Sequence, residues 1–351
     1  MPSNAHLAEA LFRLAESHPP GDLRLGLLRA AYAVFDHPRE LDRQRQVPAT
    51  IPLEALPTVS MLRAALSEDA LAAVVQRLSG PHPVRHTHTR EGYLTAAEVD
   101  AVLTEDGELD PAHLRGAVHW HTRASDGATT LEAMARACSR RGASWAVVAD
   151  HTRGLACVIG LDGEGAAMQR RQIDAWNRRH GDETRLLAGL EVEILDDGRL
   201  DLPRTDRRGV LVIAAVHTEL SERRDQTPRL LRALDEPGVW ALAHPRGRLF
   251  ARRGGIRASW ERIFERASEA GVLIEINGFP RRQDPDSALL RLATECGCRF
   301  VLGSDAHHPR HLAFEATAVA LAREAGVPRE RIVNFDHVET VLAASEELGP
   351  E

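Results

Sequence analysis

Lysine is absent from this chain of 351 residues, so all 44 of its basic side chains are arginines. The absence excludes every mechanism that needs a lysine amine, including Schiff-base catalysis, the phosphate-binding lysine of a P-loop and the strand lysine of protein kinases. Cysteine is scarce as well, and Cys296 and Cys298 form a lone C-x-C motif. So few cysteines do not make a disulfide framework, and one C-x-C pair lacks the second pair of a structural zinc site.

Long apolar runs are also missing, since none approaches the roughly 18 residues that cross a bilayer. Residues 1–16 lack the basic start and apolar core of a signal peptide. We therefore expect a cytoplasmic protein with no membrane partner. The net charge of −7 argues against strong non-specific binding of nucleic acid, although bound cations would offset part of this charge.

Three regions differ in their sequence pattern. Residues 1–80 carry apolar side chains at helical spacing and predict a small helical N-terminal region. Residues 81–111 are polar and predict a linker with one short helix at 95–103. From 112 to 345, short apolar runs alternate with amphipathic segments, which indicates an α/β domain with a parallel sheet covered by helices.

The apolar runs of the third region are short enough to be buried strands. They predict seven strands, at 117–118, 145–149, 186–190, 210–216, 239–243, 272–276 and 300–302. The amphipathic segments predict helices at 130–141, 166–179, 227–234, 259–270, 286–296 and 312–325. The first of these helices carries a candidate capping box of Thr129 and Glu132. Seven parallel strands favour a barrel over an open sheet.

Histidines and carboxylates follow these apolar runs one after another. In chain order they are His119 and His121, Asp150 and His151, Glu191, His217, His244, and Asp305 and His307, while the sixth run contains Glu275 and ends in Asn277. The catalytic groups of parallel barrels come from the C-terminal ends of the strands. Residues two apart on a strand face the same side, so His119 and His121 should point inward and Trp120 outward. Paired imidazoles suit a cation such as zinc or manganese.

One further carboxylate completes the candidate set, and a second H-x-H motif lies outside it. Asp126 lies on the turn after the first strand, and Glu191 can bridge two metals because a carboxylate has two oxygens. His86 and His88 repeat the H-x-H spacing, but no apolar strand precedes them. We interpret that second motif as an ordinary loop and expect no metal there.

The order of these motifs resembles the PHP (polymerase and histidinol phosphatase) superfamily. The motifs are H-x-H, Ser-Asp-Gly, Asp-His, Gly-x-Glu, a strand-ending His, His-Pro, Glu-Ile-Asn and Ser-Asp-Ala-His, within about residues 115–341. Residues 189–203, 244–249 and 277–282 are most similar to the C-terminal PHP domain of bacterial and archaeal family X DNA polymerases. The residues before 115 are too few for the palm of such a polymerase.

The resemblance implies a distorted seven-stranded (β/α)7 TIM-like barrel, a PHP metal-dependent hydrolase domain at 112–345, that binds two to three divalent ions such as Mn, Zn or Fe. It assigns one ion to His119, His121, Glu191 and Asp305. It assigns a second to Glu191, His217 and His244, and a third to Asp126, His151 and His307. Two positions depart from the family pattern. Ala117 stands where members carry an aspartate, which removes a contact that would orient a ligand, and Glu193 replaces a frequent aspartate.

Metal-dependent hydrolysis of phosphate esters is the expected function. Bound metals lower the pKa of a water to about 7 and clamp the attacking and leaving oxygens. The expected catalytic residues are His119, His121, Glu191, Asp305 and Arg248, where Arg248 would grip the phosphate ahead of Arg246, Arg281 and Arg282.

The substrate and the reaction class have alternatives. A DNA 3′ end, in DNA repair, and a small phosphate monoester, as for a histidinol-phosphatase-like enzyme, are both candidate substrates. An amidohydrolase-like metal hydrolase also begins with H-x-H on a barrel, and a non-catalytic scaffold is the third possibility. No expectation about the oligomeric state follows from the sequence.

Overall fold

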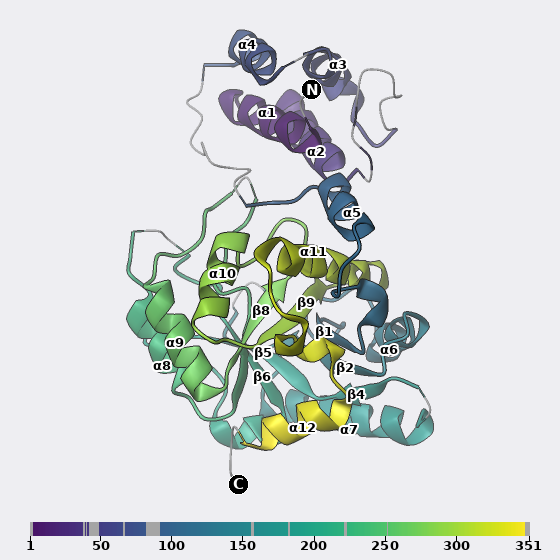
Figure 1. Cartoon of the computed structure of the whole chain (residues 1–351), viewed down its shortest axis with the longest axis vertical. Coiled ribbons are helices and arrows are strands. Elements are labelled where there is room, and N and C mark those ends of the chain that lie inside the picture. Colours follow the sequence, from purple (N-terminus) through teal and green to yellow (C-terminus); the bar gives the residue numbers. More distant parts are fainter. Residues whose placement is uncertain are drawn as a thin grey trace. The chain divides into compact units, whose positions relative to one another are not determined.

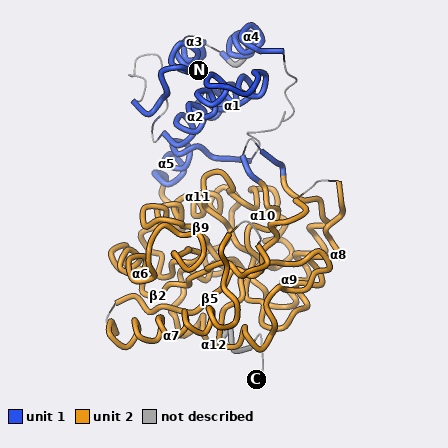
Figure 2. Tube along the Cα trace, turned by 180° about the vertical axis from the view of Figure 1, so that it is seen from behind, with its two compact units in different colours: residues 1–105, 249–254 blue, residues 106–248, 255–351 orange. Residues whose placement is uncertain are grey.

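The computed structural model describes residues 3–37, 39, 41, 49–65, 67–81, 92–155, 158–181, 183–220, 223–250 and 252–347. Residues 68 and 344–347 are described by their backbone only. The chain forms two compact units, which Figure 2 distinguishes by colour. Unit 1 comprises Met1–Glu105 and Leu249–Gly254, and unit 2 comprises Asp106–Arg248 and Gly255–Glu351.

Unit 1 is helical. Its helices are α1 (Asn4–Ser17), α2 (Asp22–Phe35), η1 (Leu53–Ala55), α3 (Leu56–Arg63), α4 (Glu68–Leu78) and α5 (Ala96–Thr104). The apolar positions of α1 and α2 pack into a common core with α3 and α4. Phe250 is buried in the same core, and its ring centroid lies 5.1 Å from that of Phe12 and 4.4 Å from that of Phe35. A segment far along the chain therefore completes the helical core.

Unit 2 contains one all-parallel sheet, shown in Figure 1, with nine strands rather than the seven expected. The strands are β1 (Gly116–Trp120), β2 (Trp145–Val148), β3 (Asp150–His151), β4 (Arg185–Leu187), β5 (Gly189–Glu193), β6 (Leu211–Ala215), β7 (Val239–Leu242), β8 (Leu273–Asn277) and β9 (Phe300–Ala306). Their order in the sheet is β3-β5-β6-β7-β8-β9-β1-β2-β4. The expected α/β architecture with a curled parallel sheet is present, and the expected strand number was wrong.

One additional strand, β3, directly follows the predicted strand at 145–149, and the other arises because the predicted strand at 186–190 is divided into β4 and β5. Ala149 separates β2 from β3, and Ala188 separates β4 from β5. These two segments pair with each other twice, β2 with β4 and β3 with β5. A Cβ atom at Gly189 would overlap the carbonyl oxygen of Val148, so glycine permits this close approach. If β2 and β3 are counted as one segment, and β4 and β5 as another, parallel pairing passes through seven segments and returns to β1. This pairing curls the sheet into a TIM-like form.

Helices cover the outside of this sheet. They are α6 (Leu131–Arg140), α7 (Gly163–Arg179), α8 (Thr227–Leu234), α9 (Trp260–Ala270), α10 (Ser287–Glu295), α11 (Glu315–Ala325) and α12 (Val338–Glu347). Short 3-10 turns accompany them, at η2 (Pro111–His113), η3 (Arg204–Arg207), η4 (Pro309–Phe314), η5 (Arg329–Arg331) and η6 (Val333–Phe335). The N-cap of α6 is Thr130, whose hydroxyl accepts a hydrogen bond from Ala133 N, and not Thr129 as the sequence suggested. None of the described helices has the length and apolar character needed to cross a membrane.

Strand side chains alternate between two apolar layers. The inner layer draws on strands all round the sheet and includes Val118, Val147 and Ile213. The outer layer joins the sheet to α6 and α7 and includes Ala117 and Trp120. Trp120 is therefore directed outward, as predicted.

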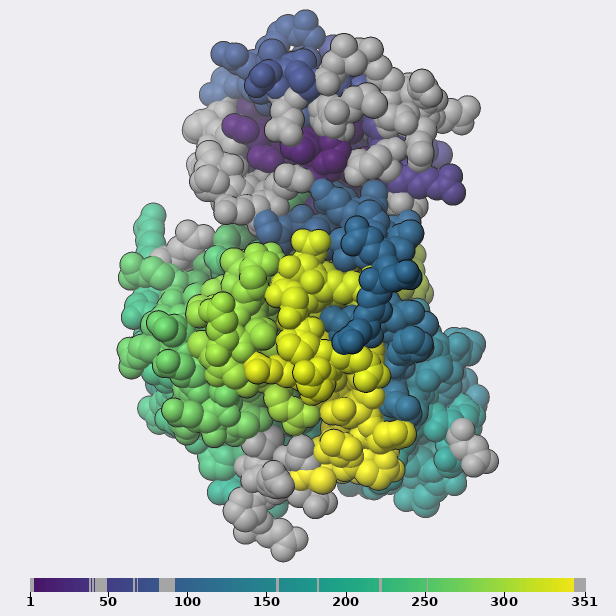
Figure 3. Space-filling view, in the orientation of Figure 1, coloured from purple at the N-terminus to yellow at the C-terminus, as the bar shows by residue number. Residues whose placement is uncertain are grey.

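The first and last segments of unit 2 lie side by side. Arg115 N donates a hydrogen bond to Asn334 O at 2.8 Å, and Arg323 Nε donates one to Leu109 O at 2.6 Å. Figure 3 shows the blue residues that lead into β1 beside the yellow C-terminal segment. The side chain of Asn334 also bonds the backbone of Gly116 and Leu302, which fixes β1 beside β9.

Candidate metal centre

All nine predicted metal-ligand residues converge at the C-terminal ends of the strands. Among the described residues, three groups of side chains bring their ligand atoms within 4.8 Å of one another. The groups are His119, His121 and Glu191; His151, Glu191 and His217; and His121, Asp126, His151 and His307. The remaining two candidates, His244 and Asp305, contact the same groups.

Glu191 lies at the middle of this arrangement, and its two oxygens face different imidazoles. Oε2 lies 3.3 Å from His119 Nε2, 3.6 Å from His121 Nε2 and 3.0 Å from His151 Nδ1. Oε1 lies 3.2 Å from His217 Nε2 and 2.8 Å from His244 Nε2. The carboxylate therefore divides its two oxygens between two sets of ligand atoms, which is the arrangement needed to bridge two cations.

Asp305 and Asp126 extend the centre on either side of His121. Asp305 Oδ1 lies 3.3 Å from His121 Nε2, next to the Oε2 side of Glu191. Asp126 Oδ2 lies 3.1 Å from His307 Nε2 and 3.6 Å from His151 Nε2. A third potential cation position therefore lies beside the first two.

The chemistry of the buried atoms fits metal ions. Six buried side-chain atoms at the centre have no hydrogen-bond partner among the described residues: His119 Nε2, His121 Nδ1 and Nε2, Glu191 Oε2, His217 Nε2 and His244 Nδ1. Buried polar atoms are normally paired, because an unpaired one costs roughly 1–3 kcal/mol. Unpaired imidazole nitrogens beside carboxylate oxygens are the donor set that zinc, manganese or iron accepts.

Three of the candidate ligands have an unusual backbone conformation. The φ angles of His119, His244 and Asp305 are +60°, +24° and +50°. Each such residue costs on the order of 1–3 kcal/mol and tends to mark a functional site. At β1 the pairing register also shifts between Val118 and Trp120, so the strand bulges at His119. Because Val118 already faces inward, this bulge is what allows His119 and His121 to face inward as well.

Two carboxylates that are not predicted ligands orient the histidines. Glu275 Oε1 accepts a hydrogen bond from His119 Nδ1 at 2.5 Å, and Glu275 Oε2 accepts one from His244 N at 2.6 Å. Glu193 accepts one from His217 Nδ1 at 2.7 Å. The two bonds to imidazole nitrogens fix the tautomers of His119 and His217 and direct their Nε2 atoms towards Glu191, whereas the bond from His244 N holds only the backbone of that residue. His119 therefore has an orienting partner despite Ala117, and it comes from a different strand.

Chain packing places Glu275 close to β9. A Cβ atom at Gly303 would overlap the Glu275 carboxylate, so only glycine leaves room for this hydrogen-bonded position.

Asp150, the other buried carboxylate nearby, instead holds the loop that carries Asp126. It accepts hydrogen bonds from Thr122 N, Thr122 Oγ1 and Ser125 Oγ at 2.7, 2.7 and 2.6 Å.

Comparison with known proteins agrees with the motif pattern. No family model matches the chain. The chain is 32% identical over 241 residues to the DNA polymerase/3′-5′ exonuclease PolX of Bacillus subtilis, a match covering 67% of this chain and 41% of that protein. It is 30% identical over 161 residues to a probable phosphatase of Caldanaerobacter subterraneus, covering 42% of this chain and 61% of that protein. The chain belongs to the PHP superfamily.

The chain thus spans about four to six tenths of the length of these PHP relatives. Among solved structures, the histidinol phosphate phosphatase of Lactococcus lactis, complexed with zinc, L-histidinol and phosphate, is 14% identical with a TM-score of 0.41. That match covers 58% of this chain and 92% of the other.

The predicted arginines of this PHP site occupy different positions. Arg248 is buried, and its Nη1 and Nε contact Asp286 Oδ2 at 3.3 Å and Arg282 O at 3.0 Å. Arg246 also pairs with Asp286, at 2.5 Å. Arg282, by contrast, donates from Nε to Asp305 Oδ2 at 2.8 Å. Of these three arginines, Arg282 is the one that contacts a candidate ligand. His86 and His88 lie outside the described residues.

Burial and mutual charge shift the pKa values of the PHP centre. Burial raises the pKa of Glu191, but interactions with the neighbouring histidines His151, His119 and His217 outweigh burial, and the net pKa falls well below the usual value. Burial lowers the pKa of His151 to about 3. Burial also lowers the pKa of His217, but Glu191 and Glu193 outweigh it and raise that pKa to about 9. Glu191 is therefore ionised and His151 is neutral, the states in which a carboxylate and an imidazole bind metal.

Proposed function

We propose that this PHP chain is a metal-dependent phosphoesterase that binds two to three divalent ions, of zinc, manganese or iron. The observation that carries the proposal is Glu191, a buried carboxylate whose Oε2 and Oε1 face separate groups of histidines. A carboxylate in this position can hold two cations close together, which is the requirement of two-metal phosphoryl chemistry.

The residues that would hold each ion follow from their proximity. His119, His121 and Asp305 would bind one ion with Oε2 of Glu191. His217 and His244 would bind the second with Oε1. Asp126, His151 and His307 would bind the third, with His121 and His151 close to more than one position. Ions bound there would supply Lewis acidity and lower the pKa of water near the substrate.

The side chains around the centre supply orientation and charge. Glu275 and Glu193 hold His119 and His217 with Nε2 directed inward. Arg282 donates through Nε to Asp305, and its two Nη groups form no hydrogen bond or ion pair with the described residues. We therefore propose Arg282, rather than Arg248, as the residue that grips non-reacting phosphate oxygens, because a guanidinium fork matches two such oxygens.

Phosphate-ester hydrolysis is the chemistry shared by the relatives' names, which describe a 3′-5′ exonuclease and a probable phosphatase. These two names correspond to two candidate substrates of the same centre, a DNA 3′ end and a small phosphate monoester. A phosphoester of either kind would present oxygens to Arg282.

A substrate panel tests this function. The protein, loaded in turn with manganese, zinc and iron, would be assayed with a chromogenic phosphomonoester and phosphodiester, histidinol phosphate, sugar phosphates and 3′-recessed DNA. A chromogenic amide serves as the substrate of an amidohydrolase. We expect metal-dependent release of phosphate or nucleotide and no amide cleavage. Amide cleavage alone would favour the amidohydrolase alternative, and a metal-loaded protein inactive on every substrate would favour a scaffold.

A further inference from the structure

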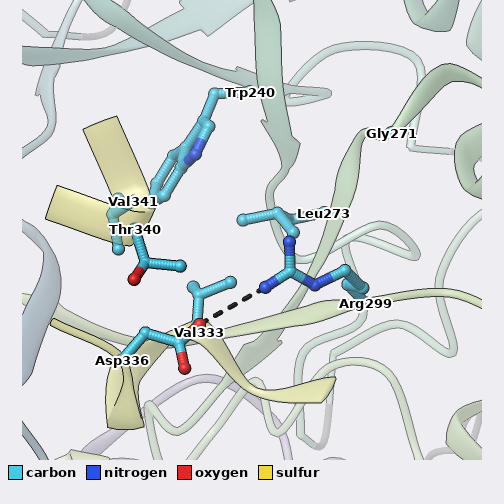
Figure 4. A pocket seen from close by; sticks show the side chains of 8 residues that line it. All are labelled: Trp240, Gly271, Leu273, Arg299, Val333, Asp336, Thr340 and Val341. Carbon is cyan, nitrogen blue, oxygen red and sulfur yellow. Dashed lines mark hydrogen bonds and ion pairs between the residues drawn. The ribbon is translucent and has the colours of Figure 1, made fainter. Parts of the chain in front are cut away.

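Two cavities of unit 2 lie away from the metal centre. The smaller has a volume of about 20 Å³ and is lined by the residues of Figure 4, among them Trp240, Leu273 and Val341. This volume corresponds to roughly one water molecule. Its only arginine, Arg299, pairs with Asp336 at 3.3 Å. This cavity has neither the space nor the free charge for a ligand.

The larger cavity is a cleft of about 1160 Å³ at the N-terminal ends of the strands. Its walls come from α7, from the start of β4, from η3 and the turn that leads into β6, and from the turn before β7. Six arginines line it: Arg170, Arg171, Arg185, Arg204, Arg207 and Arg208. Asp174 is the one carboxylate among the lining residues. The cleft is therefore strongly cationic, although the whole chain has a net charge of −7.

Most of this positive charge is not compensated within the described part of the protein. The exposed side chains of Arg171, Arg185 and Arg208 form no ion pair or hydrogen bond with any described residue. Arg170 instead bonds the backbone carbonyl of Arg208, at 2.5 Å, which holds α7 against the η3 turn. Like charges gathered in one cleft repel one another, so the arrangement favours an anionic ligand.

Arg207 provides a second and independent indication. Its side chain is only 6% exposed, and Nη2 pairs with Glu236 Oε2 at 3.2 Å. The Nε and Nη1 atoms are buried and have no hydrogen-bond partner among the described residues. Buried donors of this kind are normally satisfied. An oxyanion in the cleft would provide the missing acceptors for a guanidinium that already lines its wall.

We infer that this cleft binds a compact polyphosphate anion, such as inorganic tripolyphosphate or the phosphate groups of a nucleoside triphosphate. Arginine matches phosphate oxygens in bidentate fashion, and the six side chains come from three separate parts of the fold that surround one volume. A long nucleic acid requires a continuous basic stripe rather than a group of arginines around a single cleft, and the net charge of −7 opposes its approach. The site is distinct from the metal centre, which lies at the opposite ends of the same strands.

Calorimetric titration of the metal-loaded protein tests the inference. Tripolyphosphate and a non-hydrolysable ATP analogue would be the probes, with single-stranded oligonucleotide as the rival ligand. We expect the double variant Arg171→Ala/Arg208→Ala to weaken polyphosphate binding by about tenfold or more. The matched control is Arg178→Ala/Arg179→Ala, which removes the same charge from the last turn of α7 outside the cleft and should bind as the parent does. Tighter binding of the ATP analogue than of tripolyphosphate would identify a nucleotide site, and equal binding a site for the phosphates alone.

A third variant distinguishes anion binding in the cleft from anion binding at the metal centre. Glu191→Gln impairs that centre, so polyphosphate binding to the cleft should persist in it. Binding that disappears in Glu191→Gln and persists in Arg171→Ala/Arg208→Ala would place the anion at the metals and overturn the inference. Equal loss in both arginine double variants, or binding of the oligonucleotide alone, would overturn it too. None of these results depends on whether the metal centre hydrolyses phosphate esters.

Discussion

The two ends of the unit 2 strands carry opposite chemistry. At the C-terminal ends, buried histidines and carboxylates face one another, and Glu275 and Glu193 hold two of the histidines in place. At the N-terminal ends, six arginines line an open cleft, and three of them have no partner among the described residues. One sheet thus carries a cluster suited to cations and a cluster suited to anions, separated by the length of its strands.

The two ends also differ in how their side chains are positioned. The candidate metal ligands depend on positive φ angles at His119, His244 and Asp305 and on a bulge in β1. The arginines of the cleft come from a helix, a strand start and a 3-10 turn, with no lining residue other than glycine at positive φ. Strained, buried positions fix atoms closely, as catalysis requires, whereas long side chains at an open cleft can adjust to a ligand. Substitutions at the C-terminal ends should therefore have the larger effects on turnover.

The largest effect is expected for Glu191→Gln. A neutral amide is a poor bridge between two cations, although its size and packing are nearly the same. We expect turnover to fall by at least about 10²-fold, which corresponds to a barrier increase of roughly 2.7 kcal/mol. Elemental analysis should show the loss of at least one metal equivalent. Glu315→Gln is the matched control, because Glu315 is also buried but contacts Arg141 rather than the centre. Equal activity of both variants would remove the bridging role from Glu191.

Gly303→Ala should have the next largest effect, although glycine carries no functional group. The added methyl group overlaps the position of the Glu275 carboxylate, which would then release His119 Nδ1 and His244 N. Loss of such an orienting partner typically lowers metal affinity or activity by about 10- to 100-fold. Gly181→Ala is the control, since a Cβ atom there has no neighbour within 4 Å. Unchanged metal affinity in a folded Gly303→Ala protein would show that Glu275 does not position the ligands.

Glu193→Gln should have a smaller effect on the same end of the sheet. The glutamine oxygen can still accept the His217 Nδ1 hydrogen bond, but its neutral side chain no longer makes the imidazole more basic. We expect about a tenfold decrease in affinity for the ion near His217, with a smaller loss of turnover than in Glu191→Gln. A metal titration with activity as the readout would separate the change in metal affinity from the change in turnover. A loss of turnover larger than that of Glu191→Gln would move the bridging position by two residues.

The smallest expected effect on turnover is at Glu315, outside both ends, where the expected change concerns stability instead. Burial raises the pKa of Glu315 to about 8, and Arg141 offsets part of that rise. Its folded-state pKa lies above the unfolded value, so its contribution to stability is complete at pH 4 and is lost as the pH rises towards 8. We expect the free energy of unfolding of the parent protein to fall across this window by on the order of a few kcal/mol relative to that of Glu315→Gln, with a lower unfolding temperature as the readout. Parallel pH profiles for the two proteins would contradict this assignment.

Much of the fold could be predicted from the alternation of short apolar runs and amphipathic helices. The predicted helix at 227–234 has the same bounds as α8, and each of the seven apolar runs lies in or next to a strand. The division of β2 from β3 and of β4 from β5 was missed, because it depends on which neighbour each half pairs with. The burial of Phe250 among the helices of unit 1 was also missed, because a single aromatic residue in a loop carries no periodic signal.

The sequence by itself determined which side chains follow each strand, and those nine candidate ligands are the ones that the fold brings together. Their order along the chain was informative because the ends of parallel strands meet at one edge of a curled sheet. Tertiary structure alone decided that the β1 bulge turns His119 inward, that Gly303 makes room for Glu275, and that Arg282 reaches Asp305 while Arg248 pairs with Asp286. It also gathered six arginines from three separate segments into one cleft. The physical reason is that these relations depend on distances between segments far apart in the chain, which packing sets and local sequence does not encode.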